Sequence, residues 1–155
     1  MNLFQKMTVN DLYLKGMSQP IIVRADENLI RVIKKFTEFP EARGVVVVDE
    51  DKKLLGVFTR RDLLDWARVK VGIHSDAGKL WLAEDTRLLK IIMSFTAGDL
   101  ISPESSRAWV GLKDSLSQAL QLMADLDLIC LPVLDDGQII GDLKLMEILA
   151  CVVQE

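Results

Sequence analysis

The pattern of apolar and polar positions in this chain of 155 residues occurs twice. In the segment VRADENLIRVIKKFTE, the apolar residues Leu29, Val32, Ile33 and Phe36 have the i, i+3, i+4, i+7 spacing of one helix face. The segment VGLKDSLSQALQLMAD, which begins at Val110, repeats this spacing. The sequence therefore predicts two amphipathic helices at equivalent positions of an internal repeat.

Each predicted helix is followed by two short runs of strand-forming residues. The β-branched runs at 45–48 and 139–140 suit strands. Acidic residues at 49–51 and 135–136 suit turns, and Gly137 can supply a positive φ. Strand, turn and strand at this spacing predict a β-hairpin, so each copy is a βαββα unit.

The two copies divide the chain into three parts. We expect the first repeat at residues 8–72, a helical linker at 73–97 and the second repeat at 98–153. One unit of about 60 residues has only a marginal core, so we expect the two copies to pack together about a pseudo-twofold axis. The expected fold class is α/β (α+β), built from tandem βαββα repeats.

Composition then narrows the possible functions. Half of the residues are hydrophobic, 27% are charged and the formal net charge is −4, which describes a well-packed domain rather than a nucleic-acid-binding face. No apolar run could cross a membrane, and the N-terminus lacks the apolar core of a signal peptide. We expect a cytoplasmic protein that contacts neither nucleic acid nor membrane.

The sequence lacks a catalytic constellation. Its one histidine, His74, stands beside Ser75 and Asp76, whereas the members of a catalytic triad converge from separate elements. The two cysteines form no C-x-x-C pair, and no glycine-rich phosphate-binding motif occurs. We therefore expect a protein that is not an enzyme and holds no tightly bound metal.

A short motif ends each predicted hairpin. In LGVFTRRDLL, residues 55–64, Thr59 and Asp62 have the spacing of a capping box, which by itself is only a helix start. In the second copy, IGDLKLMEIL, Lys144 and Glu147 replace them. Because lysine offers no hydrogen-bond acceptor and glutamate is longer than aspartate, we expect the second site to be weak, altered in ligand or empty.

The segments VVVVDEDKKLLGVFTRRD and LPVLDDGQIIGDLKLME resemble the cystathionine-β-synthase (CBS) domain. The two copies together resemble a CBS pair, or Bateman module. The resemblance implies a regulatory module that binds AMP, ADP, ATP, S-adenosylmethionine or NAD in clefts between the repeats and forms homodimers. It also implies an effector, which we expect to be a separate protein reached in trans. The alternative is a ligand-free dimerisation or protein-interaction module of the same fold.

The resemblance further implies that Thr59 and Asp62 are the ribose-binding pair. Arg60 and Arg61, between them, suit phosphate groups at a helix N-terminus, although both also fit an exposed helix face. Lys144 could reach the phosphates of a nucleotide held by Asp62; the alternative is a lysine that is solvated or paired with Asp142.

The implied adenine slot comes from the first strand and from the start of the next one. Its residues would be Ile22, Gly44 and Val45, where the glycine would allow a base to approach the backbone. The same apolar residues would form the core of any βαββα unit.

Overall fold

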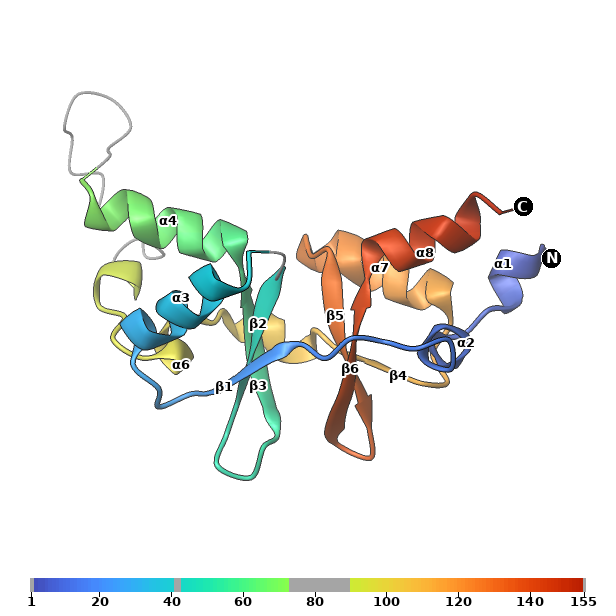
Figure 1. Ribbon diagram of the computed structural model, residues 1–155, viewed down its shortest axis with the longest axis horizontal. Helices are drawn as coiled ribbons and strands as arrows, with labels where there is room; N and C mark the ends of the chain where they lie inside the picture. The colour runs from blue at the N-terminus through green and yellow to red at the C-terminus, as the bar shows by residue number, and fades with distance from the viewer. Residues whose placement is uncertain (1, 41–42, 73–89, 155) are drawn as a thin grey trace.

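The structure, a computed structural model, describes residues 2–40, 43–72 and 90–154 as two βαββα repeats side by side (Figure 1). The first repeat contains β1 (Ile21–Arg24), α3 (Leu29–Glu38), β2 (Gly44–Val48), β3 (Leu54–Thr59) and α4 (Arg60–Lys70). The second contains β4 (Val110–Gly111), α7 (Leu116–Leu126), β5 (Cys130–Asp135), β6 (Gln138–Lys144) and α8 (Leu145–Val152). Helices α1 (Leu3–Lys6) and α2 (Val9–Tyr13) precede the first repeat, while α6 (Ala97–Leu100) and the 3-10 helix η2 (Pro103–Arg107) precede the second. The expected fold class and order of elements are confirmed.

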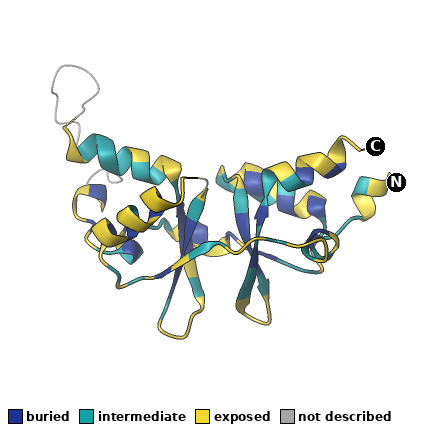
Figure 2. Cartoon of the chain, viewed as in Figure 1, coloured by how far each residue is buried: buried dark blue, intermediate teal, exposed yellow. Residues whose placement is uncertain are grey.

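Each repeat forms one three-stranded sheet in which the middle strand pairs parallel on one side and antiparallel on the other. The middle strand of the first sheet is buried on both faces. Val45 and Val47 belong to the core beneath α3, whereas Val46 and Val48 belong to the core shared with the second repeat. This explains why β2 is continuously apolar instead of alternating. Figure 2 shows the buried residues concentrated in the strands and the inner faces of the helices.

The helix that precedes the first repeat packs into the second repeat. Val9 and Leu12 of α2 lie in the same core as Leu116 of α7. The Val9 N–H donates to the Asp114 carbonyl at 2.9 Å, and the Leu116 N–H donates to the Met7 carbonyl at 3.0 Å.

The helix that precedes the second repeat packs into the first in an equivalent way. Ala97 and Leu100 of α6 lie in the core with Leu29 of α3. The Ala97 N–H donates to the Glu27 carbonyl and the Leu29 N–H to the Phe95 carbonyl, both at 3.0 Å. Each repeat is therefore closed by a helix that leads, in sequence, into the other repeat.

Two connecting segments cross between the repeats as a result. The first strap, residues 14–20, passes in front of β6, and the second strap, residues 101–109, lies against β3 (Figure 1). Each strap passes close to a glycine: a Cβ on Gly141 would collide with Met17, and one on Gly56 would collide with Ser105. These glycines occupy the same position of the repeated motif, and the crossing gives the reason for both.

The replacement of Gly56 by alanine should destabilise the fold. The new methyl group would collide with the Ser105 hydroxyl, which accepts a hydrogen bond from the Val57 N–H at 3.1 Å, and would lie 3.0 Å from Ile101 Cδ1. We expect a loss of about 1–3 kcal/mol in the free energy of unfolding, measured by urea denaturation. The control is Gly111→Ala, whose added Cβ would meet nothing closer than 3.8 Å. Equal stability of the two variants would contradict this account of the strap.

Candidate functional site

The Thr59–Asp62 motif lies where β3 ends and α4 begins. Asp62 Oδ2 accepts hydrogen bonds from the Thr59 N–H at 2.9 Å and from the Thr59 hydroxyl at 3.4 Å, as the capping-box spacing predicts. The pair Thr8 and Asp11 at α2 has nearly the same geometry, with distances of 2.8 and 3.4 Å. The cap geometry alone therefore does not distinguish a ligand site from a helix start.

The Thr59–Asp62 motif differs from the Thr8–Asp11 pair because it borders a cavity of about 440 Å³. One wall is the β3–α4 junction, including Thr59 and Asp62. The second strap contributes Ser102 and Ser105, and the end of α7 contributes residues 125–128. The cavity is thus built from both repeats and has the size of a small-molecule site.

Sequence reasoning missed the strap and the α7 residues in this wall. Ser105 is buried, and its hydroxyl donates to the Ser102 carbonyl at 2.7 Å while it accepts from the Val57 N–H. No motif in the strap indicates this position. The repeat itself is the one indication in the sequence, because the segments that lead into β1 and β4 connect one repeat to the other.

The two arginines of the motif lie in different surroundings. Arg61 borders the cavity, and its Nε lies 3.8 Å from Asp65 Oδ2. Arg60 donates to the Pro40 carbonyl and is not among the residues lining the cavity. Of the two, only Arg61 is placed to meet a ligand in this cavity.

The second copy of the motif has different contacts. The Glu147 carboxylate accepts from the Lys144 N–H at 3.1 Å, and the lysine side chain supplies no cap. Lys144 Nζ instead hydrogen-bonds Ser18 Oγ of the first strap. Figure 1 shows the N-terminal ends of α4 and α8 facing each other, but neither Lys144 nor Glu147 lines the cavity beside Asp62. A role for Lys144 at the Asp62 site therefore stays a prediction.

The residues of the expected adenine slot lie on paired strands but do not line one cavity. Gly44 and Val45 line a space of only about 10 Å³ between the two sheets, with Thr59 on its wall. Ile22 is 41% exposed and borders a separate cavity of about 690 Å³ between the hairpins. The space lined by Gly44 and Val45 is too small for an adenine ring, so this assignment also stays a prediction.

A partly buried carboxyl lies at the contact between the sheets. Asp142 stands at the position of buried Val57 in the first repeat and lines the small space with Cys130. Burial raises the pKa of Asp142 to about 6; Lys144 opposes this shift and Glu147 adds to it. Burial likewise raises the pKa of the Cys130 thiol to about 12, and the Asp142 carboxylate adds to that shift.

Some predictions fall on residues that the structure does not describe. His74, Ser75 and Asp76 lie in the segment 73–89, as does most of the linker expected at 73–97. Across the described ranges 2–40, 43–72 and 90–154, no helix is both long enough and apolar enough to cross a membrane.

A family model of the CBS domain matches residues 9–68 and 97–153. The chain therefore belongs to the CBS-domain family, and its two matched regions make it a CBS pair. The matches indicate no catalytic family.

Solved structures of other CBS proteins have this fold over nearly the whole chain. CBSX2, crystallised in complex with AMP, is 24% identical with a TM-score of 0.70, over 96% of this chain and 97% of that one. A CBS domain-containing protein from Thermotoga maritima is 25% identical with a TM-score of 0.72, over 96% of each chain. A CBS protein from Agrobacterium tumefaciens is 19% identical with a TM-score of 0.68, over 98% of this chain and 99% of that one. A search of curated proteins gives no match.

The raised pKa of Asp142 should make stability depend on pH. The folded state binds the proton of the Asp142 carboxyl more tightly than the unfolded state does. The contribution of this bound proton to the free energy of unfolding is therefore fully present below pH 4 and is lost as the pH rises to about 6. The variant Asp142→Asn should lack this loss and gain about 1–2 kcal/mol relative to wild type between pH 4 and pH 7. Urea denaturation at several pH values measures the difference, and Asp135→Asn in the same hairpin is the control. Parallel pH profiles for wild type and Asp142→Asn would contradict the assignment.

Proposed function

We propose that this CBS pair is a regulatory, non-catalytic module that binds an adenosyl ligand and signals to a separate partner protein. The observation that carries the proposal is the cavity of about 440 Å³, in which Thr59 and Asp62 of one repeat face the second strap and α7 of the other. The AMP complex of the similar protein CBSX2 supports the ligand class.

The wall of the cavity offers the groups that a ribose needs. The Asp62 carboxylate suits the ribose hydroxyls, and Arg61 and the Ser102 side chain border the same space. AMP, ADP, ATP, S-adenosylmethionine and NAD share the adenosyl part that such groups would recognise. A ligand here would contact both repeats at once, so binding would favour one relative placement of the two. A partner that distinguishes those placements would receive the signal.

Ligand binding should stabilise the wild-type protein and depend on Asp62. A thermal-shift screen with AMP, ADP, ATP, S-adenosylmethionine and NAD should give an increase of several degrees in Tm with at least one compound. The variant Asp62→Ala should lose this increase, because it removes the carboxylate from the cavity.

The control for this variant is Asp11→Ala, because Asp11 forms the same cap at Thr8 away from the cavity. Each variant should lower the ligand-free Tm through the loss of its cap, but only Asp62→Ala should lose the response to ligand. If no compound raises the Tm of wild type, the ligand-free interaction module becomes the better explanation.

A homodimer is part of this proposal. Apolar side chains are exposed on α4 and α8, which lie on one side of the molecule (Figure 1), and they include Leu64, Met146 and Leu149; Val153, which caps α8, is exposed too. Met146, Leu149 and Val153 follow one another at helical spacing and form a single stripe. Such a stripe suits the contact between two copies of the chain.

The substitution of this stripe should separate the copies. The double variant Met146→Glu/Leu149→Glu should sediment as a monomer at concentrations where wild type is a dimer, because two like charges would enter an apolar contact. Analytical ultracentrifugation measures the mass, and the apolar double variant Met146→Leu/Leu149→Met, which keeps the stripe uncharged, is the control. A wild-type monomer, or a dimer that survives the double substitution, would exclude this surface as the dimer contact.

A further inference from the structure

The wall of the proposed ligand cavity carries an excess of negative charge. Arg61 is the one basic residue among the described residues that line it. Five acidic residues line the same cavity: Asp62, Asp65, Glu104, Asp125 and Asp127. A cleft lined by one sign of charge concentrates the electrostatic potential. The excess of carboxylates should therefore favour a cationic ligand over an anionic one.

Two of these carboxylates already interact with neighbouring groups. Asp62 accepts from Thr59 and supplies negative charge at the N-terminal end of α4. Asp65 Oδ2 lies 3.8 Å from Arg61 Nε, and Asp65 Oδ1 lies 3.8 Å from Arg68 Nη1 of the guanidinium group. Asp62 therefore partly neutralises the partial positive charge at the N-terminus of α4, which would otherwise attract a phosphate. Asp65 likewise partly neutralises the positive charge of Arg61.

The other three carboxylates lack such compensation. Within the part of the chain that the structure describes, no lysine, arginine or histidine forms a salt bridge with Glu104, Asp125 or Asp127. Asp125 accepts a hydrogen bond from Gln121 Nε2 at 2.8 Å, which leaves its charge in place. The C-terminal end of α7 carries no basic residue in its last turn and adds its own partial negative charge.

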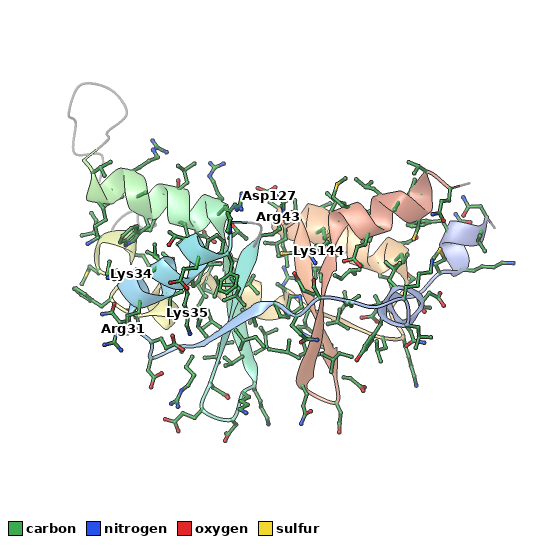
Figure 3. All side chains as sticks on the ribbon, in the orientation of Figure 1. Arg31, Lys34, Lys35, Arg43, Asp127 and Lys144 are labelled. Carbon is green, nitrogen blue, oxygen red and sulfur yellow. The ribbon has the colours of Figure 1, made fainter. Side chains whose placement is uncertain are left out.

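Two cations near the centre of the molecule lie outside this wall. Figure 3 shows Arg43 and Lys144 between the two halves, in the same central region as Asp127. Neither cation lines the cavity, and the Lys144 amine is hydrogen-bonded to Ser18 of the first strap.

We propose that this cavity selects an adenosyl compound that carries a cationic group in place of a phosphate chain, an inference that rests on the ligand-binding function proposed above. A sulfonium or ammonium group beside the ribose would face Glu104, Asp125 and Asp127, whereas phosphates would be repelled by the same residues. The described residues contain no group of three acidic, histidine or cysteine side chains placed to hold one metal ion. The carboxylates are spread along the wall, as suits an extended organic cation more than a compact one.

The test is a series of adenosyl compounds of decreasing charge. Isothermal titration calorimetry on the full chain, at low ionic strength and without divalent cations, would compare S-adenosylmethionine, neutral methylthioadenosine, AMP and ATP. We expect affinity to fall in that order, with S-adenosylmethionine at least about tenfold tighter than AMP. The preference should shrink as salt is added, because exposed charges are screened.

The double variant Asp125→Asn/Asp127→Asn tests the residues directly. It should reduce the preference for S-adenosylmethionine over AMP by about fivefold, because it removes two negative charges from the wall. The matched control is Asp135→Asn/Asp136→Asn, which removes the same charge from the β5–β6 turn. Asp127 and Asp136 have φ values of 53° and 51°, a conformation that asparagine tolerates, so both pairs should fold.

The outcomes separate this inference from the proposed function. Tighter binding of AMP or ATP than of S-adenosylmethionine would overturn the charge preference and leave the adenosyl site intact. An unchanged preference in the double variant would overturn the role of Asp125 and Asp127. Failure of every compound in the series to bind, together with no response to ADP or NAD in the thermal-shift screen, would overturn the proposed function and this inference with it.

Discussion

Backbone hydrogen bonds that join α2 to α7 and α6 to α3 fix the relation between the two repeats. Through them, Val9 completes the core of the second repeat and Ala97 completes the core of the first. Neither core would be closed by its own repeat alone, which fits the limited burial available to a unit of about 60 residues. The exchange also brings both straps across a strand at close range, at Gly56 and at Gly141, where an added Cβ would meet strap side chains.

The candidate site is a direct consequence of this exchange. Without the second strap, Thr59 and Asp62 would only begin α4, as Thr8 and Asp11 begin α2. The strap places Ser105 against β3, and the end of α7 completes the opposite wall. Because the cavity belongs to both repeats, any ligand in it is coupled to their relative placement, and a differential affinity for two placements is what a regulatory module requires.

The sequence predicts the local structure well because local structure depends on short-range patterns. The two βαββα units, the hairpins, the positive φ of Gly137 and the Asp62 cap all follow from spacing and turn chemistry. The side chains that share the cavity depend on packing between distant segments, which no short pattern encodes. Arg60 and Arg61 are neighbours in sequence, yet the rotation of the helix places only Arg61 at the cavity.

The two copies of the motif are related by the repeat but differ in their chemistry. Beside Thr59 the wall is rich in carboxylates, whereas in the second copy Lys144 hydrogen-bonds the first strap. Between them, Asp142 replaces the apolar residue found at Val57, and burial of this carboxyl weakens the contact between the sheets when it is ionised. Where two placements of the repeats differ in this contact, a weaker contact lowers the free-energy difference between them. A ligand can shift an equilibrium only by its differential affinity, so a small difference between placements is the condition under which one bound molecule changes the populated state.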